Sequence, residues 1–325
     1  MPGPRPTDLV ALLRGAMRAL VTGAGGFVGR HLVAHLVDAG DEVGTTDPSH
    51  GGADITDAAA IAAEVAAAAP EVVYHLAGWA DVGGSWNDPV ATFRANAEGT
   101  LNVLAAASAA GVGRVVAVSS ADVYGKAGPE EMPLTEQSPL RPASPYAASK
   151  VAADYLGLQA WLGRELPVLR VRAFNHLGPG QADKFVASAL ASRIARAERD
   201  GGEVLRIGNL SARRDYTDVR DVVRAYRLLA LRGEPGEAYN VCSGVDLAVQ
   251  EVADLLLARA TVALRFETDP DLLRPVDTPV LKGSHAKLTA AVGWEPEIPI
   301  ETTLTDLLND WRQRVTGPTP EPPGR

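Results

Sequence analysis

The sequence predicts an α/β fold, with a doubly wound parallel sheet and a smaller, interleaved C-terminal domain. Three observations support this prediction. Short apolar runs alternate with longer, alanine-rich helical patterns; a glycine-rich turn joins the first run to the first helix; and 46% of the 325 residues are hydrophobic, enough for a sizeable core. Strand–helix alternation is typical of a parallel sheet covered on both faces, and ligands then bind at the carboxyl ends of its strands.

The expected strands are short buried runs, and the expected helices lie between them. Strands are expected at 19–21, 42–45, 72–76, 115–119, 168–171 and 239–241, and helices at 30–39, 58–68, 96–110 and 146–162. After residue 173 the loops lengthen, and strand-like pieces at 204–207 and 263–266 interrupt the helices. We therefore predict a sheet domain at 17–173, a smaller domain at 174–315 in which 215–245 returns to the sheet, and disordered, proline-rich ends at 1–16 and 316–325.

The composition excludes several classes of protein and partner. A formal net charge of −9 argues against nucleic acid as the main partner, because binding to phosphate backbones needs a basic surface. No apolar run reaches about 18 residues, so we expect neither a membrane-spanning helix nor a membrane partner. The single cysteine, Cys242, fits a reducing, cytoplasmic compartment, and no neighbour would activate its thiol. The histidines lack the spacing of metal ligands, so no metal is expected.

Residues 19–29, ALVTGAGGFVG, place Gly23, Gly26 and Gly29 directly after the first strand and before a helix. Glycines at this spacing allow a tight turn, close approach of the backbone to a pyrophosphate, and close packing of helix on strand. The unpaired N–H groups at the helix start then face the phosphates. The alternative is a glycine-rich turn that binds nothing, but the strand–loop–helix context favours a dinucleotide. Phe27 and Val28, between the glycines, belong to this predicted cofactor site.

Asp47 stands about 20 residues after the glycine loop, at the end of the second strand. A carboxylate here accepts hydrogen bonds from the adenosine ribose and repels a 2′-phosphate, and Pro48 and Ser49 bring no arginine to offset that repulsion. NAD(H) is therefore favoured, with NADP(H) as the alternative; a plain turn-starting aspartate is the structural alternative. Asp54, with Ile55, is expected near the adenine, unless Asp54 caps the next helix.

Ser119 and Ser120 end the fourth strand, and Tyr146 and Lys150 open a helix in the segment YAASK. The i, i+4 spacing places the last two side chains on one helical face. An ammonium near a phenol stabilises phenolate, so we expect the pKa of Tyr146 to lie below its ordinary value of about 10. This would suit Tyr146 to proton transfer. An exposed tyrosine–lysine pair without a function is the alternative reading of this segment.

Six motifs in order resemble the extended short-chain dehydrogenase/reductases that act on nucleotide sugars. They are TGAGGFVG (22–29), HLAG (75–78), NAEGT (96–100), SSADVYG (119–125), YAASK (146–150) and FNHLGPG (174–180). The resemblance implies a Rossmann-type dinucleotide-binding domain at 17–173, a mainly substrate-binding domain at 174–315, and a homodimer formed through helices 96–110 and 146–162. It makes Tyr146 the acid/base, Ser120 the hydroxyl that holds the substrate oxygen, and Lys150 the ligand of the nicotinamide ribose. The resemblance also assigns further residues to the cofactor site: Leu76, Ala77, Gly78, Asn96, Ser119, Tyr146 and Lys150.

Four C-terminal segments, 172–181, 209–226, 239–244 and 274–312, resemble most the reductases of this family that act on GDP-4-dehydro-6-deoxy-D-mannose. The resemblance makes a GDP-sugar the favoured substrate. Arg214 and Arg274 could clamp its diphosphate bidentately. Asn175 could bind the sugar–phosphate link, and Asp277 the ribose hydroxyls. Arg213 should point elsewhere.

Four further residues are candidates for a role near the reacting centre. Ser85 is a candidate contact of the sugar. Its neighbour Trp86 could touch the sugar or pack in the core. His75 and His176 are expected to be structural.

The segment Ser120-Ala121-Asp122 bears on the reaction type. Family members that eliminate water carry a Thr-Asp-Glu-type segment here, whose two acids handle the protons. This chain lacks the first acid, which disfavours elimination, although Asp122 stays a candidate catalytic residue. We expect NAD(P)H-dependent reduction of a 4-keto nucleotide sugar. The alternatives are a C4-epimerase with tightly bound NAD⁺, a 4,6-dehydratase, and a non-catalytic dinucleotide-binding sensor, which the presence of both Tyr146 and Lys150 disfavours.

Overall fold

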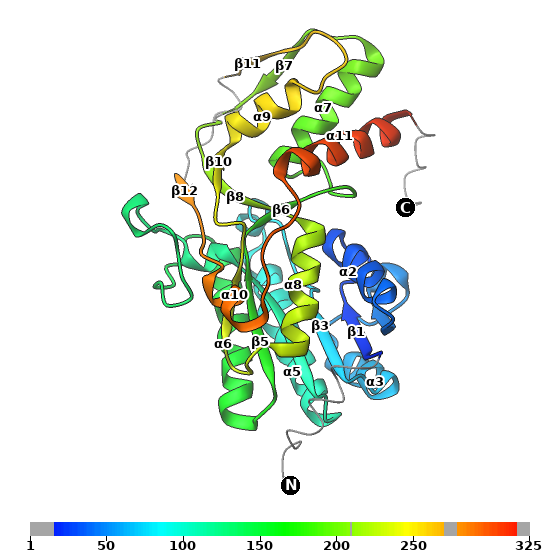
Figure 1. The fold of residues 1–325 in the computed structure, drawn as a ribbon. Helices are drawn as coiled ribbons and strands as arrows, with labels where there is room; N and C mark the ends of the chain where they lie inside the picture. Colours follow the sequence, from blue (N-terminus) through cyan, green and yellow to red (C-terminus); the bar gives the residue numbers. More distant parts are fainter. Residues whose placement is uncertain (1–15, 209, 270–277, 317–325) are drawn as a thin grey trace.

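The computed structural model describes residues 16–208, 210–269 and 278–316. Its larger lobe contains a six-stranded sheet in which every neighbouring pair is parallel (Figure 1). The order across the sheet is β2 (Glu42–Thr46), β1 (Arg18–Thr22), β3 (Val72–His75), β4 (Arg114–Ser120), β5 (Val168–Ala173) and β9 (Ala238–Val241). Strand order reverses between β1 and β3, so the carboxyl ends of these two strands flank the crevice where such sheets bind ligands.

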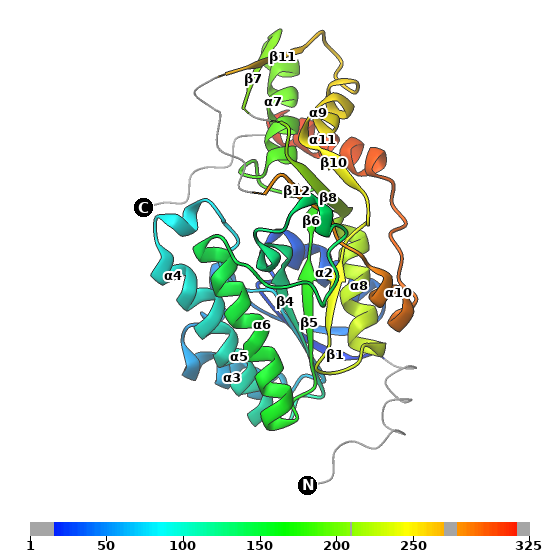
Figure 2. The same cartoon turned by 90° about the vertical axis from the view of Figure 1, so that its left-hand side faces the viewer.

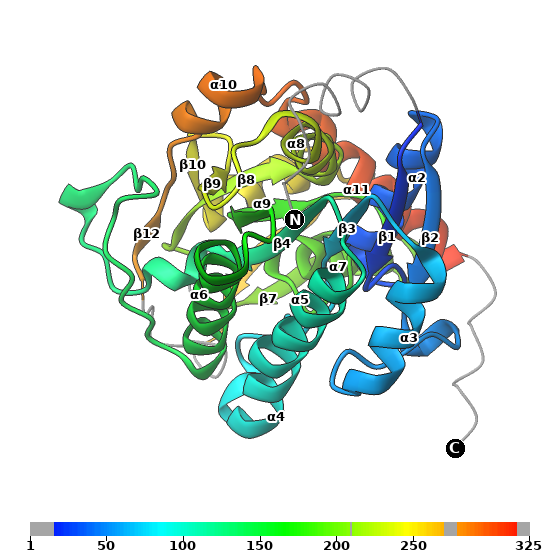
Figure 3. The same ribbon diagram turned by 90° about the horizontal axis from the view of Figure 1, so that it is seen from below.

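Helices cover both faces of this sheet, as Figures 2 and 3 show. On one face lie α2 (Phe27–Asp38), α8 (Val219–Arg232) and α10 (Ala286–Val292), and on the other α3 (Ala58–Ala68), α5 (Gly99–Ala109) and α6 (Pro145–Arg164). Each set buries its apolar side against the sheet in a separate hydrophobic cluster. Ser144 caps α6 by accepting a hydrogen bond from Ala147 N, and Pro145 occupies the first helical position. These local signals fix where α6 begins, and therefore where its second residue, Tyr146, stands.

A smaller lobe lies beyond the carboxyl ends of the large sheet (Figure 1). Its helices α7 (Val186–Asp200), α9 (Val249–Leu257) and α11 (Ile300–Thr316) pack around one hydrophobic cluster. Its strands are the parallel pair β7 (Val204–Ile207) and β11 (Arg265–Thr268), and a sheet of β10 (Asp246–Ala248), β8 (Arg213–Asp218) and β12 (Val280–Leu281), with β6 (Asn175–Leu177) paired to β8. Short elements complete the description: η1 (Pro48–His50), η2 (Gly84–Trp86), α4 (Pro89–Phe93), the π-helical η3 (Arg94–Glu98), η4 (Ala121–Tyr124) and η5 (Pro129–Glu131).

The predicted α/β class and all six predicted strands of the large sheet are confirmed, with ends that differ by one or two residues. Four details differ. Helix α2 begins at Phe27 rather than residue 30, because Gly26 is its extended N-cap and Gly29 lies inside the helix. The helix expected at 96–110 begins as the π-helical η3, and the strand expected at 263–266 is β11, two residues further on. Thr316, assigned to the tail, ends α11.

The predicted domain boundaries stay a prediction, as does the disorder of the ends, which fall almost wholly outside the described residues. Within the described residues, no helix is long and apolar enough to cross a membrane.

Candidate active site

The glycine loop fits tightly between the ends of β1 and β3. Gly23 has φ +72°, and a Cβ on it would lie 2.7 Å from the backbone nitrogen of Ala77. A Cβ on Gly29 would overlap the carbonyl oxygen of Gly23 and lie 2.7 Å from the Cα of Ala24. Gly26 begins α2 as its N-cap. The bare backbone and the start of α2 therefore form a cradle that fits the pyrophosphate of a nicotinamide dinucleotide.

Asp47 is hydrogen-bonded to the glycine loop. Its carboxylate accepts hydrogen bonds from Gly25 N (3.0 Å) and from the backbone and hydroxyl of Ser49. Burial alone would raise the pKa of Asp47, but these hydrogen bonds and the nearby His50 outweigh it and lower the pKa. The carboxylate is therefore ionised at neutral pH, directly after β2 and next to Gly25 of the glycine loop. Phe27 and Val28, in the first turn of α2, are half-buried.

Asp54 does not cap the next helix. Its carboxylate accepts hydrogen bonds from the backbone and hydroxyl of Thr56, whereas Asp57 is the N-cap of α3. The cap alternative for Asp54 is therefore wrong, because the cap is Asp57, three residues further on, and the helix begins at Ala58. Ile55 is buried, and its carbonyl accepts a hydrogen bond from Asn102.

His75, at the end of β3, is held between two threonines. Its Nδ1 lies 2.8 Å from Thr22 Oγ1, and its Nε2 lies 3.0 Å from Thr100 Oγ1. Burial and the positive charge of Lys150 lower the pKa of His75 to about 3, so the ring is neutral. This placement agrees with the structural role expected of His75. The next residue, Leu76, donates its backbone N–H to Thr22 O, next to the glycine loop.

Asn96 joins the loop after β3 to α6. Its side chain accepts a hydrogen bond from Trp79 N and donates to Ser149 Oγ (2.8 Å). A Cβ on Gly78 would overlap Asn96 Oδ1 and lie 3.8 Å from Lys150 Nζ, so this loop passes directly beside the lysine. Asn96 sits in the π-helical segment η3. The predicted cofactor residues from both loops are therefore brought together.

Ser120, Asp122 and Tyr146 meet at the carboxyl end of β4. Ser120 Oγ accepts a hydrogen bond from Asp122 N and donates to the Asp122 carboxylate, both at 3.1 Å. Burial raises the pKa of Asp122, opposed by Ser120 and by the charge of Arg214. Burial and the charge of Asp122 raise the pKa of Tyr146, and a hydrogen bond with Ser120 opposes them. The phenol is therefore protonated at neutral pH.

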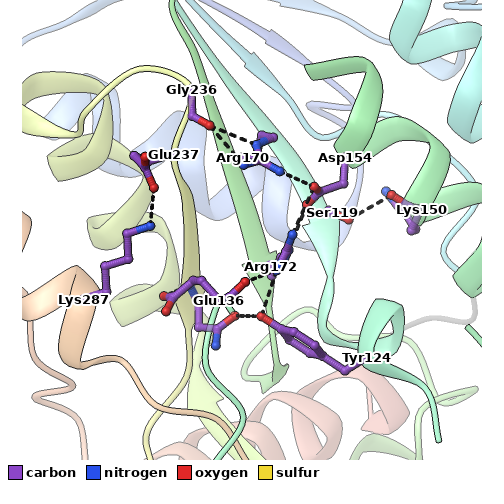
Figure 4. Close-up of polar contacts among 11 residues, drawn as sticks. Ser119, Tyr124, Glu136, Lys150, Asp154, Arg170, Arg172, Gly236, Glu237 and Lys287 are labelled. Carbon is purple, nitrogen blue, oxygen red and sulfur yellow. Dashed lines mark hydrogen bonds and ion pairs between the residues drawn. The ribbon is translucent and has the colours of Figure 1, made fainter. Parts of the chain in front are cut away.

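The expectation that Lys150 lowers the pKa of Tyr146 is wrong for this structure. Lys150 Nζ donates to Val118 O (3.1 Å) instead of reaching the phenol, and Ser119 Oγ donates to Lys150 O (3.2 Å; Figure 4). Burial lowers the pKa of Lys150 to about 8. Spacing along a helix indicated the shared face, but it could not reveal the carbonyl that competes for the ammonium.

Ser85 and its neighbour Trp86 differ in burial. Ser85 is fully buried, where its hydroxyl donates to Val82 O and accepts a hydrogen bond from Tyr146 N (3.2 Å). It thus supports the first turn of α6 directly beneath the tyrosine. Trp86 is 60% exposed, so the core-packing alternative for it is wrong.

Arg213 and Arg214 are neighbours on β8, and their side chains have different partners, which agrees with the expectation that Arg213 points elsewhere. Arg213 forms ion pairs with Asp246 and Glu251. Arg214 donates to the carbonyls of Arg213 and Thr278 and has no ion pair among the described residues, although its charge acts on Asp122. Burial lowers the pKa of Arg214. A half-buried guanidinium without a carboxylate partner beside the Ser120 site is suited to an anionic ligand.

Asn175 is exposed on β6, next to β8, and no hydrogen bond of its side chain is described. His176 Nδ1 donates to Phe174 O, and its ring stacks on Phe27 at 6.2 Å between centroids. Arg274 and Asp277, the other two predicted substrate residues, lie outside the described residues.

The sequence analysis missed a buried charge network between α6 and β5 (Figure 4). Asp154, on α6 one turn after Lys150, binds Arg170 (2.6 Å) and Arg172 (2.9 Å) of β5. Arg172 also donates to the hydroxyl of Tyr124, which follows the Ser120 strand end. Two arginines inside the otherwise apolar strand VLRVRA were the available signal, because buried charges must be paired.

The sequence predicted neither a reactive cysteine nor a metal site. Cys242 is buried, and burial raises the pKa of its thiol well above the ordinary value. In the described part of the chain, no group of three or more histidine, cysteine or acidic side chains could hold a metal ion.

The glycine cradle, the Ser120–Tyr146–Lys150 group and Arg214, which has no carboxylate partner among the described residues, fit a nicotinamide-dependent enzyme of nucleotide sugars. Comparison with known proteins agrees. A sequence model of the GDP-mannose 4,6 dehydratase family matches residues 20–307. The chain is 39% identical to GDP-6-deoxy-D-mannose reductase from Pseudomonas aeruginosa over 92% of its own length and 98% of that protein.

Solved structures give the same result. The structure of RMD from Pseudomonas aeruginosa complexed with NADPH has a TM-score of 0.86 and 38% identity, covering 92% of this chain and 100% of that one. UDP-glucose 4-epimerase from Thermus thermophilus, in complex with NAD, has a TM-score of 0.81 and 31% identity, covering 91% and 99%. The chain belongs to the GDP-mannose 4,6 dehydratase family, within the extended short-chain dehydrogenase/reductases.

Proposed function

We propose that this protein reduces the C4 keto group of GDP-4-dehydro-6-deoxy-D-mannose to give GDP-6-deoxymannose (GDP-rhamnose). The similarity to the Pseudomonas reductase, which extends over nearly the whole of both chains, supports the substrate. Ser120-Ala121-Asp122 contains one acid where the dehydratases carry two, which supports reduction over elimination.

The near-full-length similarity to the Pseudomonas reductase carries the direction of the reaction, and a neutral Tyr146 is compatible with it. Reduction of a ketone needs a hydride at carbon and a proton at oxygen, so its acid must begin in the neutral form. Burial and the charge of Asp122 both raise the pKa of Tyr146, so the neutral phenol is favoured. Oxidation of an alcohol, the first step of C4 epimerisation, needs the tyrosinate instead.

The residues of the site have complementary roles in this proposal. Ser120 holds the C4 oxygen, and Tyr146 Oη gives it a proton as the carbonyl becomes a hydroxyl. Arg214, with Arg274, binds the diphosphate, Asn175 the sugar–phosphate link and Asp277 the ribose. A reduced nicotinamide, bound by the glycine loop and Lys150, supplies the hydride. Asp122 keeps Tyr146 neutral until the proton is needed.

The cofactor is proposed to be NAD(H), with NADP(H) as the alternative. The ionised Asp47 at the end of β2 supports NAD(H), because it would repel a 2′-phosphate. The alternative is supported by the Pseudomonas structure, which contains NADPH.

We further propose a cytoplasmic homodimer that pairs through α5 and α6. Three large apolar side chains are exposed on these helices: Leu101, Tyr155 and Leu162, the last at 72%. Tyr155 and Leu162 also line a surface hollow of about 370 Å³ on α6. A patch of this kind is typical of a protein–protein contact. Light scattering that finds only monomer would contradict this proposal.

The test is spectroscopic. Purified protein is incubated with GDP-4-dehydro-6-deoxy-D-mannose and NADH or NADPH, the nicotinamide absorbance is followed, and the sugar product is identified. We expect one reduced cofactor consumed per GDP-6-deoxymannose formed. Tyr146→Phe should abolish turnover and leave cofactor binding intact. Two parallel incubations without added cofactor test the alternatives. With a nucleotide sugar that carries a C4 hydroxyl, recovery of its C4 epimer together with bound NAD⁺ would instead identify an epimerase. With GDP-mannose, formation of the 4-keto-6-deoxy derivative would identify a dehydratase.

A further inference from the structure

The first turn of α2 touches the segment 174–181 of the smaller lobe at three points. Arg30 donates from one nitrogen to Gly25 O (2.7 Å), in the glycine loop, and from another to Gly180 O (3.2 Å). His31 Nε2 donates to Pro179 O (2.7 Å). The Phe27 ring stacks on His176. The start of α2, which forms part of the cofactor cradle, therefore packs against segment 174–181.

The segment on the other side of this contact leads to the substrate side of the site. His176 is next to Asn175 on β6, and β6 pairs with β8, which carries Arg214. Towards the smaller lobe, Gly180 N donates to Asp310 of α11 (2.9 Å). Arg314, paired with Asp310, donates to Gln181 O (3.1 Å). Segment 174–181 is thus fixed to α11 at one end and continuous with the proposed diphosphate site at the other.

We propose that Arg30 is a positioning residue that couples the two ligand sites, so that a bound cofactor strengthens the binding of the nucleotide diphosphate. This inference rests on the proposed function, since it requires both ligands. A dinucleotide on the glycine loop fixes Gly25, which Arg30 joins to Gly180. The segment that carries Asn175 is then already ordered, so the second ligand loses less conformational freedom on binding.

The sign of the coupling distinguishes a connection through Arg30 from electrostatic repulsion between the two bound ligands. Both ligands carry a negatively charged diphosphate, so two sites that sense each other only through charge would weaken each other. A mechanical connection through Arg30 predicts the opposite sign. The planar guanidinium can donate to two carbonyls in fixed geometry, which a lysine ammonium does not reproduce.

The experiment measures affinities by calorimetry, on the whole protein and without turnover. The dissociation constant of NADH or NADPH is measured with and without saturating GDP, and that of GDP with and without the dinucleotide. The two ratios must agree, because coupling between two sites is reciprocal. In the unmodified protein we expect a strengthening of roughly five-fold or more.

Three variants test the role of Arg30. In Arg30→Ala the ratio should fall to one or below. Arg30→Lys keeps the charge but not the bridge, and should lose most of the coupling as well. Arg193→Ala is the matched control: Arg193 is also exposed and donates to a backbone carbonyl, Arg206 O (2.7 Å), but within the smaller lobe, so the coupling should not change.

Several results would overturn the proposal. A ratio of one or less in the unmodified protein, or an unchanged ratio in Arg30→Ala, would refute it while leaving the proposed function intact. Weaker binding of NADPH relative to NADH in Arg30→Ala, with an unchanged ratio, would make Arg30 a contact of the 2′-phosphate instead. If the unmodified protein binds neither ligand, the proposed function fails and the coupling fails with it.

Discussion

Replacing Asp154 with asparagine should destabilise the protein strongly, because it leaves two buried positive charges without the carboxylate that neutralises them. The Asp154 side chain is fully buried, and those of Arg170 and Arg172 are 11% and 5% exposed. Removing one partner of a buried ion pair costs about 3–5 kcal/mol. At about 2–4 °C per kcal/mol for a large domain, the thermal midpoint should fall by about 6–20 °C. Differential scanning calorimetry measures the shift.

Two comparisons make this prediction specific. Asp200 pairs with Arg199 at the same 2.6 Å, but both side chains are exposed, so Asp200→Asn should leave the midpoint unchanged within error. Adding Arg170→Met and Arg172→Met to Asp154→Asn removes the uncompensated charges, so the triple variant should be more stable than Asp154→Asn alone. A fall of less than about 2 °C for Asp154→Asn, or a triple variant that is less stable still, would refute the reasoning.

Three further predictions concern the site itself. Arg214→Ala should raise KM for the GDP-sugar by about 10–100-fold, because a hydrogen bond from a charged group to the diphosphate is lost. Initial rates at varied substrate concentration measure this change. Asp122→Asn removes a negative charge that raises the pKa of Tyr146, so the pKa falls and the alkaline decline of kcat/KM, where the acid loses its proton, should move to lower pH. Gly29→Ala would force a Cβ against Gly23 O and should abolish NADH binding, as fluorescence titration will measure.

Matched variants accompany these three. Arg213→Ala breaks surface ion pairs beside Arg214 and should leave KM unchanged; a comparable rise would deny Arg214 a specific role. For Asp122→Asn, a pH profile identical to that of the unmodified protein would remove Asp122 from control of the tyrosine. Gly44→Ala places a Cβ in ordinary contact with Leu20, at 3.5 Å, and should bind NADH normally. If Gly29→Ala binds equally well, the glycine loop is not the cofactor cradle.

The parts of the fold that depend on local pattern were predictable from the sequence. Most strands of the large sheet are short runs of mainly buried apolar residues, and all six lie within one or two residues of where the sequence pattern places them. The short strands β6, β10 and β12 were not predictable, because each has two or three residues and is defined by its pairing with β8 rather than by its own sequence.

The site divides in the same way. Gly23, Ser120, Tyr146 and Lys150 belong to motifs, and the structure brings them together around the ends of β1, β3 and β4. The state of the tyrosine could not be read from the motif. It depends on burial, on Asp122 and on a carbonyl that draws Lys150 away, all of which are properties of the assembled fold.

The position of β9 has a consequence for how the protein is made. β9 pairs with β5 at one edge of the large sheet, yet the chain builds β6, α7, β7, β8 and α8 before reaching it. β5 ends at Ala173 and β9 at Val241. At about 5–20 residues per second, the ribosome needs roughly 3–14 s to cover that distance. During this time the other five strands of the large sheet have been made, and β5 is an open edge that can pair with other chains. A fragment that ends at residue 173 would keep this edge exposed, and the nascent chain keeps it exposed until β9 is translated.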